Sequence, residues 1–420
     1  MSIFLNILIL INIIIFIFYR FRKYKIIQLT DFLLIMFALF FPLSLIRPFL
    51  GYESIIGYEI FEHTYLLEMC TIMTFLGLFL FFLGYFMDSL SYKIKRKVFL
   101  VERQYNYSKT YIKLVKKVNL FFIGLSLLTM YSFVKSQGNI LSYFSNIDSM
   151  RATLQGQMIN YGLLYLNSLI SIYLILITKK NTWVSKLGVL ISILLFAIYG
   201  FRGPVLSILI ILFFTLQKLN IFKIKFTFKS LLVFGLILFL YVYSQDIRES
   251  NRESEPFLLK ILTRFNGYEP LMVIYDKVIL KDFFSLSTVY YNFLSFIQLP
   301  IPRSLFPSKV EPVSLILSER IFYDIGYREF NTGGVSPTII GSLLWNFSFI
   351  GLFLMLLLGK ISSYIENRIR LNNSPIKIVF YLCMSIFLIL SIEFPENSFG
   401  VLWLLMLSFL CIRFINKFKS

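Results

Sequence analysis

Long apolar runs recur along this chain and alternate with polar segments that hold most of its charge. Runs of about 17 or more apolar residues are long enough for a helix to cross roughly 30 Å of hydrocarbon. The runs are continuous rather than alternating with a period of two, so they predict helices and not a membrane β-barrel. We expect about eleven transmembrane helices, at residues 2–19, 29–46, 65–87, 118–134, 159–178, 183–199, 204–217, 230–243, 335–358, 376–392 and 399–412.

The composition and the distribution of charge fit this interpretation. Hydrophobic residues make up 58% of the chain and charged residues only 15%, whereas a soluble chain has about 25% charged residues. The net charge is +19, but 27 of the 41 Lys and Arg residues lie in or beside the short loops on one side of the predicted membrane. This bias marks that side as cytoplasmic, with the N-terminus outside and the C-terminus in the cytoplasm. The positive charge therefore indicates topology, and no nucleic-acid partner is expected. We predict an all-α polytopic membrane protein, with residues 1–420 as a single integral membrane domain.

One long segment, residues 244–333, departs from the apolar pattern. It holds ten basic and eleven acidic residues, and the predicted topology makes it a large external loop. Within it, apolar residues recur at helical spacing over 257–265, before a break at Asn266-Gly267. The stretch 271–280 predicts a second short amphipathic helix. The loop is therefore expected to be partly helical, with amphipathic stretches that lie in the membrane plane and line a cavity.

The end of this loop predicts an anion-binding position. Gly333 and Gly334 are followed by Ser336 and Pro337, a residue that favours the N-cap and one that favours the first helical position. The predicted helix start presents its positive end and its free N–H groups to the outer face, beside two permissive glycines. An anionic ligand suits such a position.

No nucleotide-binding or metal-binding motif occurs in the sequence. The patterns G-x-x-x-x-G-K-[ST], G-x-G-x-x-G after a strand, and D-x-D are all absent. Sugar nucleotides are also not normally available outside the cytoplasm, so an external synthesis needs a donor with its own leaving group. A lipid pyrophosphate is such a donor, and arginines neutralise its departing charge in place of a metal. The external arginines that suit this role are Arg151, Arg202, Arg248, Arg252, Arg264, Arg303, Arg320 and Arg328.

Arg202 differs from the other arginines because it lies in a tight hairpin between two predicted spans. The span that follows, 204–217, is short, so the turn is expected to sit below the membrane surface. A guanidinium in a partly dehydrated position needs an anionic partner, either a structural ion pair, a lipid headgroup or a ligand phosphate.

These features together resemble the Wzy-type O-antigen and capsule repeat-unit polymerases. The resemblance rests on many spans with one long external loop and on loose sequence patterns at 200–204, 264–270, 301–309 and 333–341. It implies a membrane glycosyltransferase-like fold, related to that of O-antigen ligases, in a bacterial inner membrane. It also implies transfer of a growing glycan from undecaprenyl pyrophosphate to the next lipid-linked repeat unit, by an inverting, metal-independent route without a cofactor.

Residue roles follow from this interpretation. The residues expected to bind the donor pyrophosphate are Arg202, Arg248 and Arg264, with Arg303 and Lys309 nearby. Glu269 and Glu319 are the leading candidates for the base that takes the proton of the acceptor hydroxyl. Arg151 and Gly162 have the R-x10-G spacing that some family members carry in two external loops, but no arginine of the long loop has it. Besides the lipid-linked substrates and membrane lipids, the partners implied are a chain-length regulator and a flippase of the same pathway.

Two other functions stay open. An O-antigen ligase shares the donor but usually carries an external histidine near the end of the long loop, whereas the single histidine here is His63. A lipid-linked oligosaccharide flippase would be expected to place ionisable residues near the middle of the membrane. The predicted spans hold few such residues.

Overall fold

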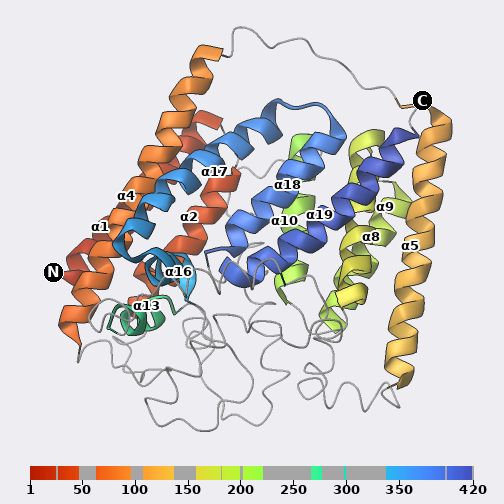
Figure 1. The fold of residues 1–420 in the computed structure, drawn as a ribbon. Coiled ribbons are helices and arrows are strands. Elements are labelled where there is room, and N and C mark those ends of the chain that lie inside the picture. Colours follow the sequence, from red (N-terminus) through yellow and green to blue (C-terminus); the bar gives the residue numbers. More distant parts are fainter. Residues whose placement is uncertain are drawn as a thin grey trace.

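The structure is a computed structural model that describes residues 1–24, 27–46, 63–95, 107–136, 158–180, 182–198, 202–220, 266–276, 298, 337–392 and 395–418. Every regular element in these residues is helical, and the helices pack side by side as a bundle (Figure 1). The elements before the long loop are α1 (Ser2–Tyr24), α2 (Leu29–Phe40), the 3-10 helix η1 (Pro42–Leu45), α4 (Thr64–Lys95), α5 (Lys109–Ser136), α8 (Met158–Thr178), α9 (Trp183–Ile198) and α10 (Arg202–Lys218). Those that follow are α13 (Tyr268–Ile274), α16 (Thr338–Phe347), the 3-10 helix η4 (Ser348–Phe353), α17 (Leu354–Leu371), α18 (Pro375–Leu390) and α19 (Pro395–Lys417).

Helices overlap each predicted span except 230–243, which lies outside the described residues, although several of their limits differ from the prediction. The segments long and apolar enough to cross a membrane are Ser2–Tyr24, Thr64–Asp88, Asn160–Thr178, Thr338–Leu371 and Gly400–Lys417. Shorter apolar helices are Leu29–Leu45, Trp183–Ile198, Gly203–Lys218 and Pro375–Leu390. The fold is thus that of an α-helical membrane protein, while the number of spans and their orientation stay predictions.

The first and third predicted spans run in the same direction. The N-terminal amine of Met1 lies 3.4 Å from a carboxylate oxygen of Glu68 near the start of α4, and Arg20 near the end of α1 contacts Tyr85 of the same helix α4. We call the end of the bundle that holds Met1 the α13 end, because α13 lies there beside α16 (Figure 1). The opposite end is called the Arg20 end.

The predicted span 335–358 is not one continuous helix. It is divided into α16, η4 and α17, and the break falls at Ser348, whose φ is 54°. A serine in this left-handed region cannot continue the α-helix. No proline marks the position, so the apolar pattern alone gave no signal of the break.

Helices at the Arg20 end also continue past the predicted limits of the spans. α1 ends at Tyr24 rather than at residue 19, and α17 ends at Leu371 rather than at residue 358. Backbone hydrogen bonding does not require apolar side chains, so a helix can continue beyond the hydrocarbon region. These extensions carry charged residues into contacts between helices.

Close backbone contact joins α4 and α17 along much of their length. A Cβ on Gly84 would overlap the carbonyl oxygen of Leu356, and a Cβ on Gly359 would overlap that of Phe81. Small residues at such crossings let two membrane helices approach closely and gain van der Waals contact.

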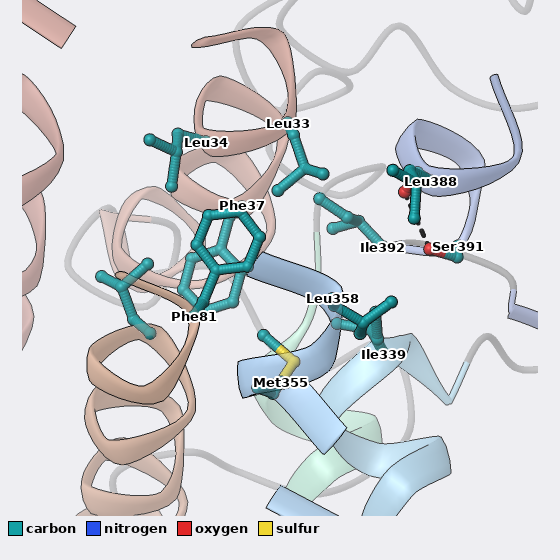
Figure 2. A pocket seen from close by; sticks show the side chains of 11 residues that line it. Leu33, Leu34, Phe37, Phe81, Ile339, Met355, Leu358, Leu388, Ser391 and Ile392 are labelled. Atoms are coloured by element: carbon teal, nitrogen blue, oxygen red, sulfur yellow. Dashed lines mark hydrogen bonds between the residues drawn. The ribbon is translucent and has the colours of Figure 1, made fainter. Parts of the chain in front are cut away.

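The core beside the α4–α17 contact is tightly packed and leaves little empty space. A cavity of only about 10 Å³ lies where α2, α4, α16, α17 and α18 meet, and apolar side chains such as Phe37 and Phe81 line it (Figure 2). The hydroxyl of Ser391 at its edge donates to the carbonyl oxygen of Leu388 at 2.7 Å. A space this small and apolar offers no polar partner for a ligand.

Candidate functional site

α13 is a described part of the predicted long loop, and it begins three residues before the short helix predicted over 271–280. The helix starts at Tyr268, directly after the Asn266-Gly267 break. Gly267 approaches α2 so closely that a Cβ on it would overlap the carbonyl oxygen of Phe40. Only glycine permits this approach without displacing one of the two elements. The backbone N–H of Glu269 donates to the side-chain oxygen of Asn266 at 3.3 Å, which satisfies one of the free N–H groups of the first turn.

α13 is buried on every side, with all seven of its residues withdrawn from solvent. Of the amphipathic helix predicted over 271–280, residues 271–274 are buried, so the exposed polar face expected of it is absent there. The physical reason is that α13 packs against both α4 and α16, so that none of its faces is left to contact lipid or water. The ring of Tyr275, just after the helix, also lies 6.4 Å from that of Phe349 in η4.

A hydrogen-bonded chain ties α13 to the long helices at the α13 end. The hydroxyl of Tyr268 donates to the amide oxygen of Asn6 on α1. The amide nitrogen of Asn6 in turn donates to Thr71 of α4 at 3.2 Å, and the Tyr268 ring lies 5.5 Å from Phe41 at an edge-to-face angle. Burial raises the pKa of Tyr268, so its hydroxyl stays protonated and remains a donor at neutral pH.

Glu269 is the predicted catalytic residue that the structure describes in full. Its exposed fraction is 1%, and it has an interaction partner. Most carboxylates of a polar loop are solvated, and a buried one is retained only with specific partners. Withdrawal from bulk water is a property that proton-transfer groups in active sites share.

The predicted anion position at the start of α16 differs from expectation in its first residues. Pro337 occupies the N-cap position and the helix begins at Thr338, so the prediction of Pro337 as the first helical residue is wrong by one position. The N–H of Ile339 donates to the carbonyl oxygen of Ile392 at 3.0 Å, and that of Gly341 donates to the hydroxyl of Thr338 at 3.4 Å. Fewer N–H groups are thus available to a ligand than an uncapped helix start would offer.

Backbone strain is present at this same position. Thr338 has a φ of 56°, a left-handed conformation that is unfavourable for a β-branched residue. Strain of this kind is found mainly where the surrounding structure over-determines it, and often at functional sites. Thr338 is the first residue of α16, the helix that packs against α13.

Arg202 is the first residue of α10, and its side chain is not described. α10 packs against α8, α9 and α18, in a different part of the bundle from α13 (Figure 1). The other candidate residues lie outside the described residues: Arg151, Arg248, Arg264, Arg303, Lys309, Glu319, Gly333 and Gly334.

A second group of polar residues, the Arg20 cluster, was missed by the reasoning from sequence. It consists of Arg20 on α1, Thr30 and Asp31 on α2, Tyr85 on α4, and Ser362 and Glu366 on α17. One guanidinium nitrogen of Arg20 lies 2.6 Å from Glu366, and another lies 2.9 Å from Asp31. The three charged residues are 1% to 4% exposed.

Hydroxyl groups complete the bonding of Glu366. Its Oε2 accepts from the Thr30 hydroxyl at 2.8 Å, and its Oε1 accepts from the Tyr85 hydroxyl at 3.2 Å. The Thr30 hydroxyl also lies 3.0 Å from that of Ser362. Buried charges are tolerated when they are paired and hydrogen-bonded in this way.

The position of the Arg20 cluster argues for a structural role. Its cation and one of its two carboxylates lie near helix ends, since Arg20 is close to the end of α1 and Asp31 is in the first turn of α2. A sequence signal was present, because Asp31 lies inside the predicted span 29–46 and an acidic residue within a span needs a partner. The cluster links α1, α2, α4 and α17 at the Arg20 end.

The described residues contain no group of three or more His, Cys, Asp or Glu side chains that could hold a metal ion. Comparison of the chain with protein-family models, curated proteins and solved structures gives no match. The fold is that of an α-helical membrane protein. At one end of the bundle lies α13, a buried helix from the long polar loop, and at the other end lies the buried Arg20 cluster.

Proposed function

We propose that this protein is a polymerase of lipid-linked oligosaccharide repeat units. The observation that carries the proposal is the burial of Glu269 on α13, a helix of the polar loop that is inserted between α4 and α16. We take the α13 end to be the outer face of a bacterial inner membrane, as the distribution of Lys and Arg predicts.

The proposed reaction transfers a growing glycan from undecaprenyl pyrophosphate to the next lipid-linked repeat unit. Glu269, or Glu319 as the other candidate, accepts the proton of the acceptor hydroxyl as its oxygen attacks the anomeric carbon of the donor. The bond from that carbon to the pyrophosphate oxygen breaks with inversion, and the negative charge leaves with the lipid. Arg202, Arg248 and Arg264, with Arg303 and Lys309 nearby, neutralise this charge, so no metal is required.

The test is a polymerisation assay in cells or with purified protein, in which the glycan is separated by length. Loss of a general base lowers the rate by roughly 100-fold or more, so Glu269→Gln is expected to yield mainly single repeat units. Arg202→Ala and Arg264→Ala are expected to shorten the product as well. Glu68→Gln is the matched control, because Glu68 is a carboxylate at the same end whose side chain is 36% exposed.

Expression level and thermal stability are measured for each variant, so that misfolding is distinguished from loss of chemistry. Products of wild-type length from Glu269→Gln would remove that residue as the base and leave Glu319 as the candidate. Wild-type length from both arginine variants would contradict the arginine assignment.

A deletion of the gene separates the proposal from the two alternative functions. A polymerase deletion leaves a surface glycan of one repeat unit. A ligase deletion leaves no glycan attached to its acceptor, and a flippase deletion causes lipid-linked repeat units to accumulate on the cytoplasmic side.

A further inference from the structure

A groove of about 350 Å³ lies between α1 and α4 on the outside of the bundle. Ile15 and Tyr19 of α1 and Phe79, Leu83 and Phe86 of α4 line it, and all five side chains are exposed. The lining is almost wholly apolar. In a membrane protein, such a surface faces the acyl chains of the bilayer.

The floor of the groove is a fixed part of the structure. Phe16 at its base is buried, and its ring lies 4.7 Å from that of Phe82 and 5.4 Å from that of Tyr85. The guanidinium of Arg20 lies 5.4 Å from the same ring. Phe16 thus contacts residues of both α1 and α4, including two members of the Arg20 cluster, and the packing between the two helices determines the shape of the groove.

Positive charge lies at one end of the groove. Lys23 follows Tyr19 by four positions on α1, so it continues the face of α1 that lines the groove, and Arg22 flanks it. Both residues are exposed, and among the described residues neither forms an ion pair within 4 Å. Arg370 of α17 lies near the same end of α1, with its guanidinium 4.9 Å from the Tyr24 ring, but neither residue lines the groove. Asp88 supplies one negative charge near this end of α4.

We propose that this groove binds one acyl chain of an anionic phospholipid, whose phosphate is bound by Lys23 and Arg22. The apolar lining accepts the chain, and the two cations lie where the headgroup region would begin. Basic residues beside a membrane helix attract anionic lipids in this way. This site lies at the Arg20 end, away from α13, and it does not depend on the proposed polymerase activity.

A second copy of the chain fits the groove less well. Copies of a membrane protein insert in the same direction, so a symmetric contact through α1 would bring Arg22 and Lys23 of each copy to the same depth. Like charges at that distance repel each other. The polar residue in the groove, Asn12, already donates to the carbonyl oxygen of Leu8 in its own helix at 2.8 Å.

The experiment uses the purified full-length chain in bilayer nanodiscs of phosphatidylcholine with a minor fraction of phosphatidylglycerol. The phosphatidylglycerol carries a photoactivatable diazirine on its acyl chain, and the cross-linked peptides are mapped. We expect cross-links concentrated on α1 and α4 around Tyr19 and Leu83. A diazirine phosphatidylcholine at the same concentration is expected to label these peptides less.

Two variants test the two parts of the site. Arg22→Gln with Lys23→Gln is expected to weaken phosphatidylglycerol binding roughly fivefold for each charge removed. Leu83→Trp is expected to reduce labelling of the groove, because the indole occupies part of the space that the acyl chain would take. The matched controls are Lys113→Gln with Lys117→Gln, an exposed basic pair of α5, and Leu128→Trp, on the exposed face of α5. Both controls are expected to leave the groove labelling unchanged.

Four results would overturn the proposal. Equal labelling of the groove and of the exposed face of α5 would mean ordinary bilayer contact. Equal labelling by the two lipids, or an equal effect of the two basic double variants, would mean that Lys23 and Arg22 select no headgroup. A disulfide between copies of a Tyr19→Cys variant in nanodiscs would make a second copy the occupant.

Discussion

A guanidinium nitrogen of Arg20 lies 2.6 Å from a carboxylate oxygen of Glu366, across 346 positions of sequence. The pair joins the end of the first helix to the end of α17, and Asp31 shares the same guanidinium. One cation thus holds two buried carboxylates, which makes Arg20 the residue on which the whole cluster depends.

We predict that Arg20→Met destabilises the protein strongly. The substitution leaves Asp31 and Glu366 buried without their cation, and breaking a buried pair in this way typically costs about 3–5 kcal/mol. Thermal unfolding in detergent measures the change. Adding Glu366→Gln to Arg20→Met is expected to recover part of the loss, because one uncompensated charge is removed. Glu68→Gln serves as a control with little effect, since its ion pair with the Met1 amine is largely solvated. A loss of equal size in this control would contradict the assigned role of the cluster.

We predict that a large side chain at either Gly84 or Gly359 separates α4 from α17. A Cβ at each position overlaps a carbonyl oxygen of the other helix, so leucine requires the backbones to move apart. Overpacking of this kind costs about 1–3 kcal/mol or more, measured as a lower unfolding temperature. Gly124→Leu on α5 provides the comparison, because a Cβ there meets nothing within 4 Å. Leucine has a higher helix propensity than glycine, so propensity cannot explain a loss. Similar losses at all three positions would therefore contradict the assignment of the effect to the α4–α17 contact.

We predict that Ser348→Gly stabilises the protein by relieving backbone strain at the break between α16 and η4. Ser348 has φ 54° and ψ −151°, a region of backbone conformation that is essentially reserved for glycine. Removing the Cβ is expected to raise the free energy of unfolding by about 1 kcal/mol, seen as a higher unfolding temperature. Ser385→Gly, within α18, is expected to have the opposite sign, because glycine inside a helix costs roughly 0.5–1 kcal/mol. Destabilisation by both substitutions would mean that the Ser348 backbone is not strained.

We predict that Tyr268→Phe loosens α13 without changing the rest of the bundle. The amide oxygen of Asn6 loses its donor, and leaving a buried acceptor without a partner costs about 1–3 kcal/mol. Hydrogen exchange should increase in residues 268–274 and stay unchanged in α18. Because burial raises the pKa of Tyr268, the hydroxyl is neutral below its ordinary pKa of about 10, and the difference from wild type should be the same at about pH 6 and about pH 8. A difference that grows between these two values would contradict this role of the hydroxyl.

The sequence alone predicted that the chain is helical and where most of its apolar helices lie. An apolar run of membrane length forms a helix because its backbone groups have no other partner in hydrocarbon, whatever its neighbours are. The break at Asn266-Gly267 was also predicted, and glycine is needed there because of the close approach to the backbone of Phe40. These features depend on interactions between residues that are close in sequence, so they can be predicted from the sequence.

The tertiary structure decided the features that depend on distant residues. The sequence placed Arg20 in a predicted loop. In the structure it is buried, and its ion pairs with Glu366 and Asp31 make that burial possible. The break at Ser348 has no proline signal, and it forms where the surrounding packing over-determines the backbone. The stretch 271–280 was predicted to be amphipathic, but its residues 271–274 belong to α13, which packs against both α4 and α16. Burial is a property of what surrounds a residue, so it could not be read from the residue's neighbours in sequence.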